Sequence, residues 1–291
     1  MKYIEKYPML VLVVGIIGIS LSAIFVKYST APSTVTAAFR LLWTVVLMTP
    51  IVFGKKEIRE ELYSMDKKQR RLSALSGVFL AAHLVLWFES LQHTTVASST
   101  TIVCTEVIWV SLGFCFFMKG KLAGKAIGAI AVTFLGSVVI ACADSGTGGL
   151  HLYGDMLALL AAIATAVYTL IGGVVRAKAS TTVYTYVVYV ACALVLLAAC
   201  LVQRQSLTAY GRSPVVVGFL LAVFSTILGH SIFSWCLKYF SISFVSASKL
   251  CEPVGAAIAA GFLFGEMPGM LQVAGSILIL GGVLYYSKIE K

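Results

Sequence analysis

The sequence contains few charged residues. Asp, Glu, Lys and Arg make up 12% of the 291 residues, and hydrophobic side chains make up 59%, whereas a typical soluble domain carries about 25% charged residues. So little charge cannot cover a soluble protein of this size with a water-compatible surface. Alternating apolar segments of about ten residues, which are typical of a membrane barrel, are also missing, and this favours helices.

Catalytic and cofactor motifs are missing as well. The sequence has no HExxH, GxSxG or Walker motif, and its carboxylates and histidines are scattered over separate apolar segments. The seven cysteines form no CxxC pair and lie inside apolar segments, where cysteine usually behaves as a small hydrophobe. These absences argue against an enzyme and against ATP-driven transport, and we expect no cofactor and no metal site.

What fills most of the chain is a series of apolar stretches, each long enough to cross a bilayer. About 20 apolar residues in a helix rise about 30 Å, the thickness of the hydrocarbon core. The first stretch has no small-residue cleavage site followed by a mature domain, so we interpret it as a retained helix. The sequence predicts an all-α integral membrane protein with ten transmembrane helices, at roughly 9–28, 33–53, 72–92, 95–118, 125–143, 154–175, 182–203, 213–237, 242–264 and 270–287.

Most of the basic residues lie on alternate loops, and the opposite loops hold little beyond Lys27, Arg204 and Arg212. The formal net charge is +10, and the segment 54–71 alone holds seven Lys and Arg residues, whereas 144–153 holds none. This asymmetry is the positive-inside pattern, and it predicts a cytoplasmic N-terminus and a cytoplasmic C-terminus in the plasma or inner membrane. Because topology explains the net charge, we expect no nucleic-acid partner.

The two halves of the chain show signs of an internal duplication. Five stretches precede the polar linker Ser145–Gly149 and five follow it, and an offset of 146 residues places Glu106 on Glu252 and Trp87 on Phe233. An odd number of helices in each half forces the halves into opposite orientations. We therefore expect two inverted five-helix repeats, 1–144 and 150–291, with a site at their midplane interface.

Three segments of the second half carry a family resemblance. The runs 238–243, 248–254 with Leu-Cys-Glu-Pro, and 262–266 ending in Gly-Glu resemble the second-half signature of the EamA-type drug/metabolite transporters. The first half departs from that pattern, because Val107 follows Glu106 where the family usually has proline, and Lys119-Gly120-Lys121 stands where Gly-Glu-Arg is common. The resemblance implies ten helices in two inverted repeats and transport by alternating access, but it implies no particular substrate.

Polar residues inside the stretches are the candidates for a binding site. An ionised side chain at the centre of a membrane helix costs about 2.5–3.5 kcal/mol on insertion scales, so each one calls for a reason. Large aromatic residues near these positions would add ring surface. We expect a midplane cavity lined by the first, third, fourth, sixth, eighth and ninth stretches, with ten substrate-binding residues: Arg40, His83, Trp87, Glu106, Trp109, Tyr168, His230, Trp235, Lys249 and Glu252.

Structural roles are the alternative for several of these residues. Arg40 could pair with Glu106 or Glu252, and Lys249 and Glu252, three residues apart, could neutralise each other. Glu106 has no Lys or Arg within four residues on its own helix, so its charge must be met by another helix, a substrate or a proton. Our hypothesis is that Glu106 binds substrate or proton and that Glu252 is its less exposed structural counterpart.

These features predict a secondary transporter that moves a small polar or amphiphilic metabolite, amino-acid-like or amine-bearing. Two midplane carboxylates flanked by aromatic rings attract cations, and a zwitterion would also satisfy Arg40 and Lys249. The alternative is a flippase for lipids or lipid-linked metabolites, with a polar groove open sideways to lipid. The expected partners are the small-molecule substrate and membrane lipids, and glycine faces such as Gly124, Gly128 and Gly136 are compatible with a monomer or a homodimer.

Overall fold

The protein is a bundle of helices. The computed structural model describes residues 7–94, 96–144, 152–252, 254–255 and 269–290. No strand occurs in those ranges, so the all-α prediction is confirmed. The helical elements are α1 (Pro8–Ser20), α2 (Ser22–Lys27), α3 (Ser33–Gly54), α4 (Lys56–Ser64), α5 (Lys67–His93), α6 (Val96–Cys104), α7 (Glu106–Phe117), α8 (Gly124–Asp144), α9 (Leu152–Arg176), α10 (Thr181–Val202), α11 (Ser213–Leu220), the π-helix η2 (Leu221–His230), α12 (Ser231–Cys236), α13 (Ile242–Ser248), the 3₁₀ turn η3 (Lys249–Cys251) and α15 (Met270–Glu290).

Each of the ten predicted stretches coincides with a helix or a stack of helices, although 256–264 of the ninth lie outside the described residues. Within the described residues, six helical segments are long and apolar enough to cross a membrane by length and composition, namely 8–27, 33–54, 67–93, 152–176, 181–202 and 213–236. Shorter apolar helices lie at 102–117, 124–136, 242–251 and 273–286. The chain is therefore built as a multi-pass membrane protein.

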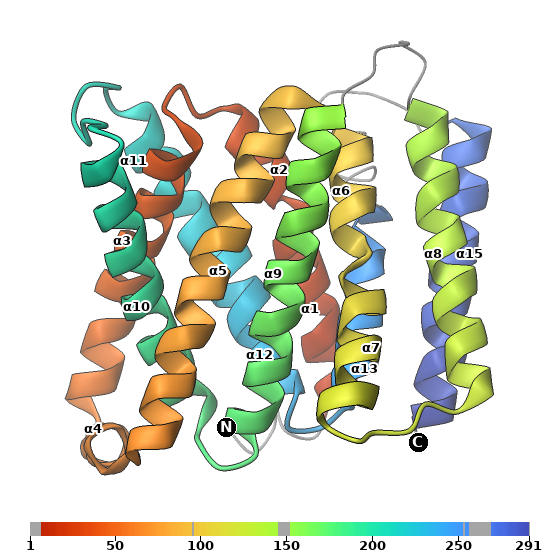
Figure 1. Cartoon of the computed structure of the whole chain (residues 1–291), viewed down its shortest axis with the longest axis horizontal. Helices are drawn as coiled ribbons and strands as arrows, with labels where there is room; N and C mark the ends of the chain where they lie inside the picture. Colours follow the sequence, from red (N-terminus) through yellow and green to blue (C-terminus); the bar gives the residue numbers. More distant parts are fainter. Residues whose placement is uncertain (1–6, 95, 145–151, 253, 256–268, 291) are drawn as a thin grey trace.

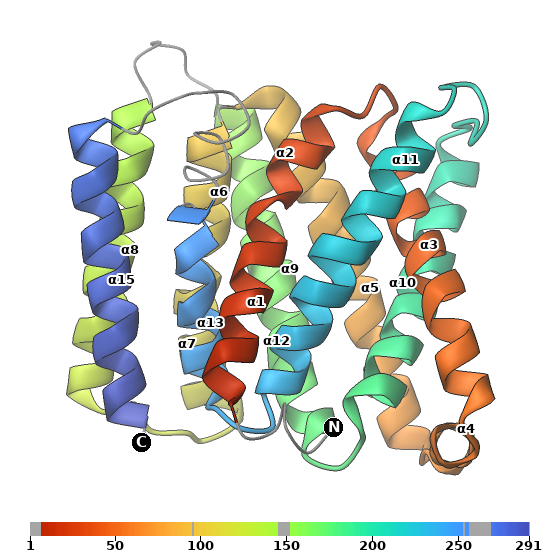
Figure 2. The ribbon, with the colours of Figure 1, turned by 180° about the vertical axis from the view of Figure 1, so that it is seen from behind.

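The helices stand side by side, and the first and last described helices have their outer ends at one end of the bundle (Figures 1 and 2). The start of α1, the end of α15 and the short helix α4 all lie at that end. Side-chain caps start three of the helices there: Asp66, Ser180 and Ser241 accept hydrogen bonds from the backbone N–H groups of Gln69, Val183 and Phe244 at 2.7, 3.3 and 3.2 Å. These caps satisfy N–H groups that a helix start leaves unpaired.

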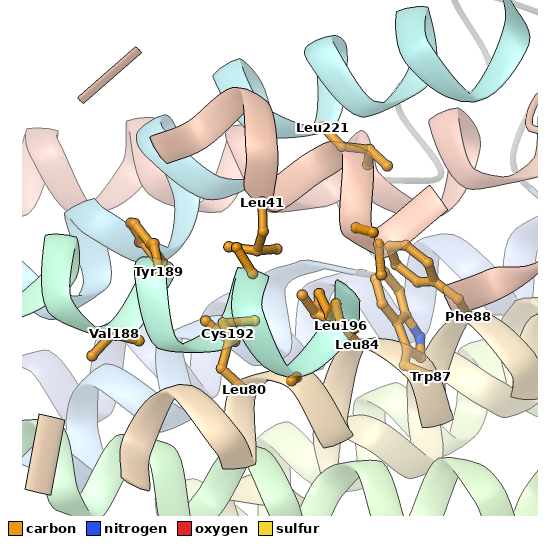
Figure 3. Close-up of a cluster of buried hydrophobic side chains, with 14 of the residues drawn as sticks. Leu41, Leu80, Leu84, Trp87, Phe88, Val188, Tyr189, Cys192, Leu196 and Leu221 are labelled. Carbon is orange, nitrogen blue, oxygen red and sulfur yellow. The ribbon is translucent and has the colours of Figure 1, made fainter. Parts of the chain in front are cut away.

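The largest buried cluster lies where α5 and α10 meet α3. Leu41, Leu80, Leu84, Val188 and Leu196 are among its members, and Figure 3 shows them gathered around Cys192, with Trp87 and Phe88 at one side. The close approach of α5 and α10 requires Gly77, because a Cβ there would lie 2.5 Å from the Val188 carbonyl oxygen. Small residues allow such contacts in lipid, where helices associate by packing rather than by a hydrophobic driving force.

Four of the predicted spans are interrupted. The first breaks at Leu21 between α1 and α2, and the fourth at Thr105 between α6 and α7. The eighth contains the π-helix η2, and the ninth the 3₁₀ turn η3. Departures from α-helix of this kind are frequent at functional sites, and in transporters a broken helix directs backbone groups toward a binding site. The four breaks converge on the cavity described next.

Candidate functional site

A small cavity lies inside the bundle, and each of the four breaks adjoins it. Ser22 follows the first break, Glu106 follows the second, His230 ends η2 and Lys249 begins η3. The cavity volume is about 40 Å³, which is room for a few water molecules. Its lining comes from the six expected spans and also from α3: Ile19, Ser22, Arg40, His83, Trp87, Val103, Cys104, Glu106, Thr165, His230, Phe233, Ser246, Lys249 and Glu252.

Glu106 and Lys249 form an ion pair in this cavity. The Nζ of Lys249 donates to both carboxylate oxygens of Glu106, at 2.8 and 3.1 Å, and both side chains are largely buried. The hydroxyl of Thr169, on α9, donates to Oε1 of Glu106 at 2.8 Å. Of the three alternatives left open for the charge of Glu106, namely another helix, a substrate or a proton, this structure shows the first, because the partner comes from the ninth span rather than from its own helix.

Glu252 is the carboxylate without a partner. Among the described residues it forms neither an ion pair nor a hydrogen bond, and its side chain is half-buried, whereas Glu106 is 5% exposed. The structure therefore contradicts the alternative in which Lys249 and Glu252 neutralise each other, and it corrects the expectation that Glu252 is the less exposed of the two carboxylates. Pro253, which follows it, lies outside the described residues. The cavity thus holds one neutralised carboxylate and one that is available to a ligand.

Arg40 is a buried cation without a carboxylate partner in the described part of the chain. Its side chain is 1% exposed, and its Nε donates to the hydroxyl of Thr226, in η2, at 2.7 Å. Its Nη1 is buried and makes no hydrogen bond within the described ranges. The structural alternative in which Arg40 pairs with Glu106 or Glu252 does not hold in this structure.

The cavity also has an aromatic side. The rings of His83 and Trp87 stack with centroids 6.0 Å apart, and His230 meets His83 edge-on at 6.2 Å. Nδ1 of His83 lies 3.1 Å from the carbonyl oxygen of Ala161, and because a carbonyl can only accept, Nδ1 carries the proton. This contact with Ala161 holds the ring in one orientation, and Nε2 takes no part in it.

Three predicted aromatic residues do not line the cavity. Trp109 packs into a separate apolar cluster beside Leu170 and Leu237. Trp235 contacts the ring of Tyr239 with centroids 4.4 Å apart. Tyr168 is buried next to the cavity, with its ring 5.9 Å from that of His230 and its hydroxyl 3.1 Å from that of Ser234. Seven of the ten predicted residues thus meet around one cavity.

Sequence reasoning missed the small polar residues of the lining. Ser22, Ser246 and Thr165 are each 2% exposed, and Thr169 completes the ion pair described above. Serine and threonine are common in apolar helices, where they bond back to their own backbone, so their positions alone gave no signal. Thr226, which does not line the cavity but accepts the hydrogen bond of Arg40, did give a signal, because it precedes His230 by four residues.

Comparison with known proteins finds a family match in the second half of the chain. Residues 152–288 match the EamA-like transporter family. The second half of the chain is an EamA-like transporter domain. The match confirms the resemblance indicated by the second-half motifs, and this domain supplies His230, Lys249 and Glu252 to the cavity, whereas Arg40, His83 and Glu106 come from the half that precedes it.

Relatives of this chain include transporters whose names give no substrate. The uncharacterized transporter YxxF of Bacillus subtilis (strain 168) is 23% identical over 265 residues, covering 89% of this chain and 82% of its own. An uncharacterized transporter of Archaeoglobus fulgidus is 24% identical over 288 residues, covering 96% and 97%. One crystal structure aligns over 98% of both chains with a TM-score of 0.79 and 14% identity, a likeness of fold alone. Together these findings indicate a membrane transporter rather than an enzyme.

Proposed function

We propose that this protein is a secondary transporter that moves a small amine-bearing metabolite across the cytoplasmic membrane by alternating access. The observation that carries the proposal is Glu252, an unpaired carboxylate at a cavity inside the membrane-spanning bundle. Leaving a charge there without a partner is costly, and an ammonium group of a substrate would supply one. The stacked rings of His83 and Trp87 offer apolar surface beside it.

Two inverted five-helix repeats account for the packing. The third span of each half packs on the first and second spans of the other half: α5 on α9 and α10, and α11 with η2 on α1 and α3. The second spans, α3 and α10, pack on each other, as do the fifth, α8 and α15. At the offset of 146 residues, the break at Thr105 falls on Cys251, the end of η3. A pseudo-two-fold axis produces matched pairs of this kind.

Alternating access is supported by a second, larger hollow. It has a volume of about 740 Å³ and is lined by Ser29, Glu89, Gln203 and Tyr210 among others. These residues belong to the α2–α3 connection, the last part of α5 and the α10–α11 connection, which lie at the end of the bundle opposite the start of α1 and the end of α15 (Figure 1). Along α2, buried Ala23 and Val26 lie between the cavity residue Ser22 and Ser29. This apolar layer is about one helical turn thick. Moving one repeat against the other would open it and connect the cavity to the hollow.

The proposed topology places both termini in the cytoplasm. In a variant without native cysteines, a membrane-impermeant maleimide added to intact cells should label a cysteine at Ser206 and not one at Ser64. Both positions are exposed. Ser64 ends α4 and Ser206 lies in the loop between α10 and α11, two segments at opposite ends of the bundle (Figure 1), and the basic residues around α4 support an inside position for Ser64. Permeabilised cells, in which both cysteines should react, serve as the control. Labelling of Ser64→Cys alone in intact cells would invert the topology.

The proposed function is tested with the purified protein in liposomes. Amino acids, primary amines, nucleotides and sugar phosphates are offered in turn, and counterflow of labelled solute is measured. We expect saturable uptake of at least one amine-bearing compound, inhibited by other compounds with the same group, because Glu252 attracts a cation. If a purely anionic sugar phosphate is the best substrate, the proposal is wrong. Scrambling of fluorescent lipids without any solute uptake would favour the flippase.

A further inference from the structure

We infer that Arg40 forms an anion subsite that binds the carboxylate of the transported solute, so that the protein selects amino acids over the corresponding amines. This inference rests on the proposed function and narrows it. The first observation is the burial of a cation whose donors are mostly unused. A guanidinium has five N–H donors, and within the described residues only Nε of Arg40 has a partner, the hydroxyl of Thr226 at 2.7 Å.

A second buried arginine, Arg176, has a structural role, and its hydrogen bonds can be compared with those of Arg40. Arg176 is 5% exposed, and it donates from Nε to the backbone oxygen of Ser234 at 3.0 Å and from Nη1 to the backbone oxygen of Ala179. Two donor atoms are thus satisfied by carbonyl groups of neighbouring segments. Nη1 of Arg40 has no such acceptor. Because an unsatisfied buried charge is expensive, this difference needs a reason, and a ligand that accepts hydrogen bonds provides one.

The surroundings of Arg40 are rich in unused hydrogen-bonding groups. Four other cavity residues have a buried polar atom without a partner in the described ranges: Ser22 Oγ, Trp87 Nε1, His230 Nδ1 and Ser246 Oγ. The indole N–H can only donate, and both hydroxyls can donate as well. A carboxylate accepts up to about four hydrogen bonds and matches the planar fork of arginine. The arrangement therefore fits an anionic, acceptor-only group.

The charges that line the cavity also favour a ligand that carries a carboxylate. Glu106 and Lys249 neutralise each other, which leaves Arg40 and Glu252 as one cation and one anion on the lining. A simple amine would use only Glu252, and a simple carboxylate only Arg40. A zwitterion that carries both groups would leave neither charge uncompensated. Specificity of this kind arises because a ligand lacking one group leaves a buried charge unpaired.

The experiment compares three matched probes for each amino acid of a panel: the amino acid, the amine that lacks its carboxylate, and the acid that lacks its amino group. Binding to the purified full-length protein is followed by ligand-dependent thermal stabilisation. We expect wild type to bind at least one amino acid at least tenfold more tightly than its matched amine. The Arg40→Gln variant should lose that preference and bind the amino acid and its matched amine equally. Arg40→Lys, which keeps the charge without the fork, should retain part of it and covers the case in which the glutamine variant does not fold.

Arg176→Gln is the matched control, because it removes a buried guanidinium away from the cavity and should leave the preference for the amino acid unchanged. Equal binding of amine and amino acid by wild type would overturn the anion subsite but leave an amine-bearing substrate standing. If only the acid that lacks the amino group binds, the amine-bearing substrate is overturned and the anion subsite stands. If chloride is the only probe that stabilises wild type, and Arg40→Gln loses this effect, Arg40 binds an inorganic anion instead. If none of the probes stabilises wild type, both proposals are overturned.

Discussion

Replacing Lys249 with methionine should lower the free energy of unfolding by about 3–5 kcal/mol, the usual cost of leaving a buried charge without its partner. Glu106 is 5% exposed, and Nζ of Lys249 lies 2.8 and 3.1 Å from its two oxygens. Without the ammonium group, only the hydroxyl of Thr169 would remain to stabilise the carboxylate. Unfolding in detergent, followed by circular dichroism as denaturant is raised, measures the loss.

A double-mutant cycle separates the interaction energy between Glu106 and Lys249 from the contribution of each side chain's surroundings. Glu106→Gln should also be strongly destabilising, because it leaves the ammonium group unpaired, whereas the double variant Glu106→Gln/Lys249→Met should recover most of the loss. The control is the exposed pair Lys56–Glu60, 3.7 Å apart on α4. Its removal should change stability by less than about 1 kcal/mol. Wild-type stability of Lys249→Met would show that the pair has no structural role.

The positions of the helices could be predicted from the sequence because hydrophobic length alone determines them. The second stretch was expected at 33–53 and α3 spans Ser33–Gly54, and the seventh was expected at 182–203 and α10 spans Thr181–Val202. A bilayer leaves little freedom here, since each crossing needs about 20 apolar residues. The breaks at Leu21 and Thr105 have no comparable signal, because neither residue is a glycine or a proline. They depend on what packs against the helix rather than on its own sequence.

Membership of the cavity could also be predicted in large part. Arg40, His83 and Glu252 were singled out because polar side chains in apolar helices avoid lipid and face the bundle interior, and all three line the cavity. The pairing of charges could not be predicted. Lys249 lies three residues from Glu252 in the chain, yet it binds Glu106, because α7, α9 and η3 bring that carboxylate and Thr169 within reach. Spacing along one helix contains no information on such a three-helix contact.

Glu252→Gln should reduce solute uptake by the reconstituted protein to the level of empty liposomes. The substitution keeps the shape of the side chain and removes the one cavity carboxylate that has no cation among the described residues. Stability should be unchanged or higher, because an unpaired charge in a membrane interior costs free energy and an amide there costs less. This is the reverse of the expectation from sequence, in which Glu106 was the transport residue and Glu252 the structural one. Uptake and thermal unfolding are measured on the same preparation.

Two further variants make the result specific. Glu252→Asp keeps the charge on a side chain one methylene shorter and should restore part of the uptake. Glu60→Gln, on the exposed face of α4, removes a carboxylate outside the cavity and should transport like wild type. Because the glutamine variant is expected to fold at least as well as wild type, loss of uptake cannot be ascribed to misfolding. Normal uptake by Glu252→Gln, with affinity for amines retained, would remove Glu252 from the binding site and transfer the recognition of the amino group to another part of the cavity.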